Sequence, residues 1–352
     1  MAKEVRKKTE STQARVPIVA ILGHVDHGKT TLLDYIRKSN VQSCEAGGIT
    51  QKISVFTISL EKKTQKKITF IDTPGHEAFD LMRTRGGSIA DIVLLVVAAN
   101  DGVKPQTLES IEIIKDSSVK PILVINKVDL PDINIQQVKR DVSDHGLLVE
   151  GMGGDIPIVE VSAKTGKGIP ELLDLISLVV EVDGLKQRDA LPQGVVAKGF
   201  VLESVKDKMK GNISSVVLEQ GNLCKGAWLG FKIDDRYIVE KVKGIISEEG
   251  SNLCDLRCGC GGRIIGISQL LPLGSEIYIL EEKDKDILES LYLDDKEKEL
   301  PENLTIAEDE IFDSLFDENK DEGTQLNIIL KSSSQGSLEA IHKSLDSIKQ
   351  EE

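Results

Sequence analysis

The sequence predicts a doubly wound α/β domain with a mostly parallel sheet, then an all-β barrel domain and the start of a third α/β domain. Residues 16–183 alternate apolar runs with amphipathic helical patterns, which is typical of strands buried on both faces of a parallel sheet. Residues 193–282 hold short β-branched runs separated by turn residues, which is typical of a small barrel. Residues 323–352 hold one strand pattern and one helix pattern. Two elements bury too little for a core, so we expect this third domain to be truncated.

The individual elements follow from the same patterns. In the first domain we expect strands in PIVAIL (17–22), KITFID (67–72), DIVLLVVAA (91–99), KPILVINK (120–127) and IPIVEVSA (156–163), and helices in residues 106–117 and 169–182. In the second domain we expect strands in residues 194–204, 211–221, 237–247 and 274–280. Residues 1–15 are predicted to be a basic flexible tail, and residues 283–322 a charged, helical, solvated connector.

Size and composition exclude several classes of protein. The 352 residues suit two to three domains, and no apolar run approaches the roughly 20 residues that a membrane helix needs. The polar, basic start is unlike a secretory signal, so we expect a cytoplasmic protein. Five cysteines are too few for a disulfide scaffold. The net charge of −14 argues against a protein that simply coats nucleic acid, although many of the acids lie in residues 281–322.

The stretch GHVDHGKTTL predicts a phosphate-binding loop. It fits the pattern G-x-x-x-x-G-K-[ST] between an expected strand and an expected helix. The glycines allow backbone N–H groups to form an anion nest, Lys29 is placed to reach the β- and γ-phosphates, and the Thr30 hydroxyl is placed to bind Mg²⁺. A chance match at a strand–helix turn is the alternative, and the loop alone does not choose between ATP and GTP. The predicted contacts are Gly23, His24, Val25, Asp26, His27, Gly28, Lys29, Thr30 and Thr31.

The stretch FIDTPGH ends the next expected strand and predicts a sensor for the third phosphate. Asp72 lies where a carboxylate approaches Mg²⁺, and Gly75 can offer a backbone N–H to a γ-phosphate because it has no side chain. Taken alone, Asp72 would more simply be a turn or helix-capping aspartate. Thr73, Pro74 and His76 complete this predicted loop.

The stretch INKVDL identifies the base. An aspartate accepts hydrogen bonds from both N1–H and the 2-amino group of guanine, whereas adenine would leave a buried carboxylate unpaired, at a cost of several kcal/mol. Asp129 is therefore predicted to select guanine. Asn126 is expected to tie this loop to the phosphate loop, the Lys127 stem to cover the base, and the VSAKTG loop to offer backbone donors to guanine O6. Val128, Ser162, Ala163 and Lys164 complete the set, and the nucleotide is predicted to be GTP.

Five stretches together resemble the translational GTPases: GHVDHGKTTLLD, EAGGITQ, DTPGHEAF, VVAANDGVKPQTLES and INKVDLP. Within them the chain resembles bacterial-type translation initiation factor two, the relative of initiation factor 5B. EAGGITQ is the distinguishing stretch, since elongation-factor relatives usually flank this GIT differently. The resemblance runs from about residue 16 to the end of the chain. It is strong in the first domain, weaker in the β-rich part, and includes LKSSSQGSLEAI, similar to the opening of that family's third domain.

The resemblance implies a P-loop GTPase domain with a switch. Thr50 would bind Mg²⁺ and sense the γ-phosphate within a switch formed by Gly48, Ile49, Thr50 and Gln51. The Mg²⁺ ligands would then be Thr30, Thr50 and Asp72. His76 would be the catalytic residue that orients the attacking water once the protein docks on the ribosome, and Val25 with Ile49 would be the apolar gate that holds His76 back. Asp26 would help to bind a monovalent cation.

The resemblance also implies a role: a GTPase, activated by the ribosome, that promotes initiator tRNA placement and subunit joining when protein synthesis starts. Its partners would be the small and large ribosomal subunits and their rRNA, and the chain would be a monomer without membrane contact. In the family, initiator formylmethionyl-tRNA binds a C-terminal domain that lies beyond the last residue here, so tRNA binding is not assigned to this chain. One alternative is a ribosome-binding regulator without productive turnover. Another is an elongation-type factor that delivers tRNA, which EAGGITQ disfavours.

Three features depart from the family or carry weak signals. Residues 232–271 lack the usual arginine-marked hairpin, which puts their ribosome contacts in doubt. Cys254, Cys258 and Cys260 could ligate zinc, but without a C-x₂-C pair or a nearby fourth ligand we interpret them as buried or incidental barrel cysteines. The basic N-terminal residues are interpreted as a disordered tail in preference to an rRNA contact; they are Lys3, Arg6, Lys7, Lys8 and Arg15.

Overall fold

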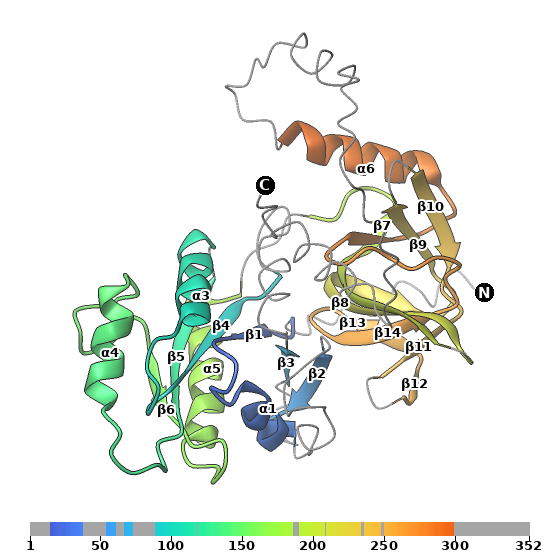
Figure 1. Cartoon of the computed structure of the whole chain (residues 1–352). Helices are drawn as coiled ribbons and strands as arrows, with labels where there is room; N and C mark the ends of the chain where they lie inside the picture. The colour runs from blue at the N-terminus through green and yellow to red at the C-terminus, as the bar shows by residue number, and fades with distance from the viewer. Residues whose placement is uncertain are drawn as a thin grey trace, which may run out of the picture.

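The structure is a computed structural model, and it describes most of the first two predicted domains. The described residues are 15–37, 54–60, 67–72, 89–117, 119–185, 190–207, 209–233, 236–247 and 250–298. They form an α/β domain and a β-rich domain that lie against each other (Figure 1). None of the helices in these ranges has the length and apolar character needed to cross a membrane.

The first domain is built on a six-stranded sheet. In spatial order its strands are β2 (Ser54–Ser59), β3 (Lys67–Asp72), β1 (Ile18–Leu22), β4 (Ile92–Ala98), β5 (Lys120–Asn126) and β6 (Ile158–Glu160). All neighbouring pairs are parallel except β2 with β3. The predicted doubly wound, mostly parallel sheet is therefore confirmed. The sequence analysis missed β2, the antiparallel edge strand.

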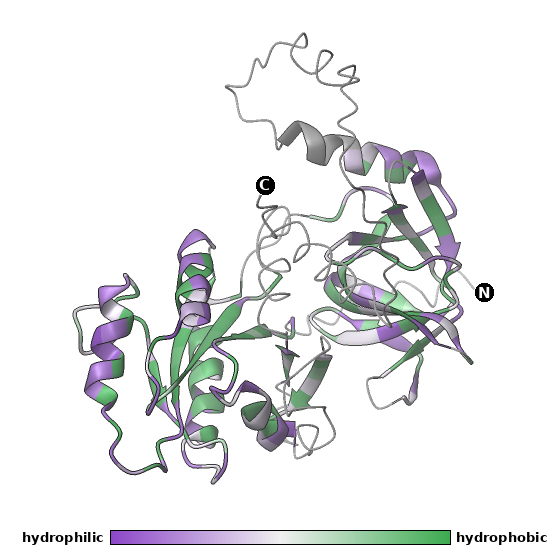
Figure 2. Ribbon diagram, viewed as in Figure 1, coloured by the Kyte–Doolittle hydropathy of each residue, from purple (hydrophilic) through white to green (hydrophobic). Residues whose placement is uncertain are grey.

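Helices cover both faces of this sheet. Helices α1 (Lys29–Arg37) and α5 (Ile169–Asp183) pack on one face, and α3 (Pro105–Asp116) and α4 (Ile135–Asp144) on the other. Strand β1 shows why both faces are apolar: Val19 and Ile21 point to the first face, whereas its other three residues point to the second. Successive side chains of any strand point to opposite faces of the sheet, and in this strand the residues on both faces are apolar (Figure 2). The helix expected after the phosphate loop corresponds to α1, and the two other predicted helices correspond to α3 and α5. Helix α4 was missed.

The second domain is an antiparallel sheet that surrounds one core. Its strands are β7 (Val195–Asp207), β8 (Gly211–Cys224), β9 (Trp228–Ile233), β10 (Arg236–Lys241), β11 (Gly244–Ile246), β12 (Asn252–Leu253), β13 (Asp255–Arg257), β14 (Gly261–Ile265) and β15 (Glu276–Leu280). The order is β10-β9-β15-β7-β8-β14-β11-β12, with β13 also on β8. Buried side chains from seven of these strands meet in a single apolar cluster, so the prediction of an all-β domain is confirmed. Pairings in the described ranges do not join β10 to β12.

Helix α6 (Lys285–Lys298) corrects one expectation. The sequence analysis treated residues 283–322 as a solvated connector, but α6 packs on β9 and β10 (Figure 1). Leu288 and Leu291 are buried in a cluster that also contains Val239 and Tyr278, and the Tyr292 hydroxyl donates to the carbonyl of Glu276 at 2.9 Å. Charged residues dominate the composition of this helix, and the few leucines on one side set its packing.

The two domains share a hydrophobic core. Phe200, Leu202 and Val217 of β7 and β8 belong to the same buried cluster as the residues that α3 and α4 cover. Strand β14 lies against β2, and a Cβ at Gly261 would overlap the side chain of Val55. Glycine, which has no side chain, allows the Val55 side chain to come this close to the backbone of β14.

Of the three cysteines that are close in sequence, Cys260 lies beside this contact. Cys254 is exposed, and Cys258 and Cys260 are half-buried. The Cys258 thiol donates to the carbonyl of Glu219. Burial raises the pKa of the Cys260 thiol, and a hydrogen bond with Thr57 of β2 opposes that rise. Within the described ranges no three metal-ligating side chains gather into a group.

Arg15 is not part of a flexible tail. Its guanidinium Nη2 lies 2.9 Å from both carboxylate oxygens of Asp91, and Asp91 also accepts the backbone N–H of Ile18 at 2.9 Å. Only 2% of the Asp91 side chain and 14% of the Arg15 side chain are exposed. The ion pair thus fastens the segment before β1 to the residue that precedes β4, which contradicts the prediction for Arg15. The other predicted tail residues lie outside the described ranges.

Replacing Asp91 should destabilise the fold. Asp91→Ala would leave the buried guanidinium of Arg15 and the Ile18 N–H without their acceptor, so we expect a loss of about 2–3 kcal/mol in the free energy of unfolding. Urea titration measures this value. The matched control is Asp255→Ala, which removes an exposed partner of Arg257 and should cost no more than about 0.5 kcal/mol. Equal losses in the two variants would contradict an anchoring role for the Arg15–Asp91 pair.

Candidate functional site

The predicted site residues that the structure describes come together at the carboxyl ends of the parallel strands. The phosphate loop follows β1, the base loop with Asn126 and Asp129 follows β5, and the VSAKTG loop follows β6. Because parallel strands all end at the same edge of a sheet, loops that are far apart in the sequence become neighbours there. This edge is where an open α/β sheet binds its ligands.

The phosphate loop has the backbone of an anion nest. Asp26 has a left-handed backbone with φ of 68°, and Gly28 follows with φ of 84°. A Cβ at Gly28 would overlap the side-chain amide of Asn126, so glycine is needed for both conformation and space. Helix α1 begins at the next residue, Lys29. Left-handed residues directly before a helix N-terminus turn backbone N–H groups toward an anion.

The side chain of Lys29 reaches back across the phosphate loop to its first residues. Its ammonium donates to the carbonyls of Gly23 and His24, each at 2.8 Å. Burial lowers the pKa of Lys29, and the carboxylates of Asp72 and Asp26 oppose that shift. A buried cation lined by carbonyls is stabilised further when a phosphate approaches, because the ligand supplies the compensating negative charge.

His27 is a neutral, structural member of the loop. It is 1% exposed, and its Nδ1 lies 3.2 Å from the carbonyl of Val96 in β4. A carbonyl only accepts, so Nδ1 carries the proton and donates it. Burial lowers the pKa of His27 from 6.5 to about 4, the bond to Val96 opposes that shift, and nearby His24 adds to it. The ring is therefore uncharged at neutral pH.

Asn126 connects three loops. Its Nδ2 donates to the carbonyl of His27 at 2.9 Å, and its Oδ1 accepts the N–H of Ala163 at 3.0 Å. The residue is 1% exposed, so both ends of its amide are satisfied away from water. The tie between base loop and phosphate loop that the sequence suggests is present as a direct hydrogen bond.

The base loop presents Asp129 to solvent. Its Oδ1 accepts the Ser162 hydroxyl at 2.7 Å, and this hydrogen bond lowers the pKa of the exposed Asp129 carboxyl. Lys127 has a left-handed backbone with φ of 63°, and its ammonium lies 3.4 Å from Asp101 in the connection between β4 and α3. The carboxylate is ionised and held at the mouth of the site.

Sequence reasoning missed the supporting residues from β4 and α3. Gln106 accepts the backbone N–H of Val25 at 2.9 Å, Asp101 pairs with Lys127, and the Val96 carbonyl receives His27. All three lie in the stretch VVAANDGVKPQTLES, which carried the family resemblance without any assigned role. The family resemblance of this stretch was a signal that it belongs to the site, but the sequence does not show which residues its side chains contact.

A magnesium ion fits the donor set that the structure describes. Thr30 lies in the first turn of α1, and Asp72 ends β3 close enough to interact electrostatically with Lys29. Hydroxyl and carboxylate oxygens are the hard ligands that Mg²⁺ prefers. Eight predicted site residues lie outside the described ranges: Gly48, Ile49, Thr50, Gln51, Thr73, Pro74, Gly75 and His76.

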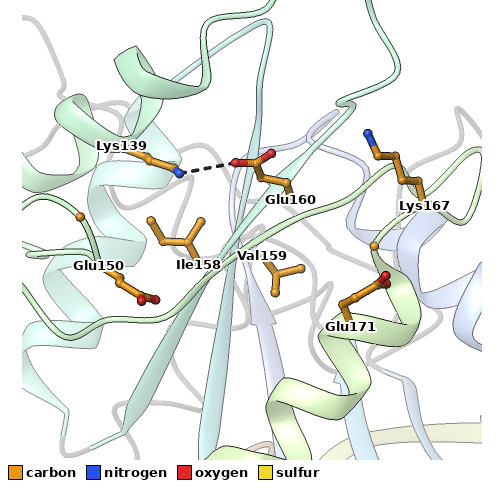
Figure 3. A pocket seen from close by; sticks show the side chains of 9 residues that line it. Lys139, Glu150, Ile158, Val159, Glu160, Lys167 and Glu171 are labelled. Carbon is orange, nitrogen blue, oxygen red and sulfur yellow. Dashed lines mark hydrogen bonds and ion pairs between the residues drawn. The ribbon is translucent and has the colours of Figure 1, made fainter.

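A separate cavity of about 490 Å³ lies at the outer edge of β6 (Figure 3). Its lining includes Ile158, Glu171 and Lys167, and the ammonium of Lys139 lies 3.4 Å from Glu160 beside it. None of the lining residues belongs to the phosphate loop or the predicted guanine contacts. The cavity therefore differs from the candidate nucleotide site.

The buried neutral His27 should make stability depend on pH. The unfolded ring binds a proton near pH 6.5 and the folded ring only near pH 4. Its contribution to stability is therefore complete above about pH 6.5 and is lost as the pH falls toward 4, by roughly 2–3 kcal/mol. Chemical denaturation from pH 4 to 7.5 should show this slope.

His27→Gln, which cannot titrate, should flatten the slope across that interval. The control is His145→Gln, because His145 is exposed and its replacement should leave the slope unchanged. A His27→Gln variant with the same pH dependence as the parent would contradict the assignment.

Comparison with known proteins agrees with this site. Residues 14–182 match the family model of the elongation factor Tu GTP binding domain, and residues 301–352 match that of translation-initiation factor 2. Translation initiation factor IF-2 of Thermoanaerobacter sp. (strain X514) is 38% identical over 354 residues, covering 100% of this chain and 49% of that protein. The same factor of Buchnera aphidicola is 41% identical over 334 residues, covering 94% of this chain and 37% of that protein. The chain thus spans about half, or less, of the length of these relatives.

Solved structures give the same result. GDP-bound aIF5B from Aeropyrum pernix superposes with a TM-score of 0.65 at 30% identity, over 81% of this chain and 57% of that one. The elongation factor SelB from Methanococcus maripaludis, in complex with a GTP analogue, has a TM-score of 0.55 at 24% identity, over 76% of this chain and 55% of that one, which supports the fold alone. With the phosphate loop, the base loop and matches along its whole length, the chain belongs to the translational GTPases, in the family of translation initiation factor IF-2.

Proposed function

We propose that this protein binds GTP and GDP with Mg²⁺ and hydrolyses GTP when the ribosome activates it, as a factor in the initiation of protein synthesis. The observation that carries the proposal is the buried amide of Asn126, which holds the phosphate loop and two base-side loops in one arrangement. Similarity to IF-2 proteins supports the ribosome as partner. The finer steps, initiator tRNA placement and joining of the small and large subunits, rest on that similarity.

The residues of the site suit phosphoryl transfer by positioning. Lys29 and the loop N–H groups would bind the β- and γ-phosphates, and Thr30 with Asp72 would hold the ion, joined by Thr50. Bound Mg²⁺ would neutralise charge between the phosphates. Asp26 remains a proposed ligand of a monovalent cation. His76 would orient the attacking water, behind a gate of Val25 and Ile49. Such a site needs a partner to complete it, so slow intrinsic hydrolysis is expected.

Asp129→Asn should change the base that the protein selects. An amide can donate to the 2-oxygen of xanthine, whereas the carboxylate pairs with the N–H donors of guanine, so affinity should shift from GTP toward xanthosine triphosphate. Competition binding with the two triphosphates measures the ratio. Asp132→Asn is the control in the same exposed loop and should keep guanine preference. Unchanged selectivity in Asp129→Asn would refute the assignment.

His76→Ala should separate binding from hydrolysis. Because the proposed role concerns only the attacking water, the affinity for GTP should remain nearly intact while ribosome-stimulated phosphate release is lost by at least about 100-fold. Multiple-turnover assays with purified ribosomes measure the release, and His145→Ala is the control.

Two outcomes would count against these proposals. Loss of GTP affinity in proportion to hydrolysis would make His76 a structural residue. An unmodified protein that releases no phosphate above its intrinsic rate with ribosomes would contradict the GTPase role and favour a regulator without turnover.

A further inference from the structure

The phosphate loop contains a strained residue that needs support. Asp26 is not a glycine, yet its φ is 68°. A left-handed backbone costs a non-glycine residue on the order of 1 kcal/mol and persists only when its neighbours enforce it. The nest that would receive phosphate depends on this conformation, so the contacts on either side of Asp26 determine whether the loop is formed before the ligand arrives.

The residue after Asp26 is fixed from two strands. His27 donates its ring N–H to Val96 of β4, and its carbonyl accepts the side chain of Asn126 at the end of β5. Its backbone N–H also reaches the carbonyl of His24 at 3.3 Å. The C-terminal side of the strained residue is therefore held by the sheet.

The residue before Asp26 is fixed by a helix. The backbone N–H of Val25 donates to the side-chain Oε1 of Gln106 at 2.9 Å. Gln106 is the second residue of α3, and its own carbonyl accepts the Ser110 hydroxyl at 2.7 Å. Pro105 precedes it, with φ restricted by its ring, and the following N–H groups of Thr107 and Leu108 bond to Lys104. The side-chain acceptor of Gln106 is therefore held by the hydrogen-bonded first turn of α3.

We propose that Gln106 is a positioning residue of the nucleotide site, which holds the phosphate loop in its binding conformation through the Val25 N–H. This inference rests on the proposed function, since it names a further residue of the same GTP site. Gln106 acts through the backbone and need not touch the nucleotide. Without it, the peptide between His24 and Val25 can rotate, and Asp26 can relax out of the left-handed region.

The same connection also reaches the other half of the site. Asp101, five residues before Gln106, pairs with Lys127 of the base loop at 3.4 Å. The segment between β4 and α3 therefore contacts the phosphate side through Gln106 and the base side through Asp101. These two contacts explain why the stretch ANDGVKPQ lies beside the site, although none of its residues is a predicted nucleotide contact.

The first test measures the hydrogen bond itself, without nucleotide. Gln106→Met keeps the length of the side chain and removes the acceptor, so amide hydrogen exchange at Val25 should become about fivefold faster. Gln106→Glu restores an acceptor oxygen at the same distance and should return exchange toward the parent rate. The matched control is Gln136→Met: Gln136 is the second residue of α4 and is exposed, and its replacement should leave Val25 unchanged.

The second test measures the consequence, with GDP and Mg²⁺ as the probe. GDP should dissociate about fivefold faster from Gln106→Met than from the parent or from Gln136→Met, while the thermal midpoint of the free protein changes little. Unchanged exchange at Val25 would overturn the inference, and so would faster exchange with an unchanged GDP dissociation rate. A parent protein that fails to bind GDP would instead refute the proposed function, which the exchange measurement does not depend on.

Discussion

The two hydrogen bonds of the Asn126 side chain are the interaction on which the candidate site depends. The parallel register of β1, β4, β5 and β6 brings three loops to one edge of the sheet, but strand pairing ends where the loops begin. At that point the buried side-chain amide of Asn126, the last residue of β5, joins the carbonyl of His27 to the N–H of Ala163. Beyond the ladder, side-chain hydrogen bonds such as these and the Ser162–Asp129 bond therefore help to set how the loops lie relative to one another.

The charges of the phosphate loop suit an anionic ligand. His27 is kept neutral by burial, whereas Lys29 carries the loop's positive charge among carbonyls and two carboxylates. A protonated His27 would place a second positive charge beside the Lys29 ammonium. It would lower the stability of the fold and disfavour the charged form of Lys29. One cation, backbone donors and a helix N-terminus remain, which is a combination selective for phosphate over a neutral ligand.

Much of the fold could be predicted because buried parallel strands are continuous apolar runs, and such runs are conspicuous. Strand β2 was missed because its residues SVFTIS mix polar and apolar side chains, as an antiparallel edge allows. Arg15 was misjudged because its partner Asp91 is distant in sequence. Helix α6 was misjudged because two buried leucines outweigh many charges. In the site, the residues proposed to contact the nucleotide could be predicted from sequence motifs, because ligand chemistry requires certain residue types at fixed spacings. Gln106 was not predicted, because a side chain that hydrogen-bonds to a distant backbone N–H produces no recognisable pattern in the sequence.

The shared core also changes what the word domain means for this chain. The sequence changes character near Gly184, and secondary structure follows that change. Yet Phe200, Leu202 and Val217 lie in the same apolar cluster as the sheet of the first domain, and Gly261 lets β14 lie flush on Val55. Separating the two parts would expose apolar surface on both. The two parts should therefore unfold together in one cooperative transition, and the boundary visible in the sequence should not separate two independently unfolding units.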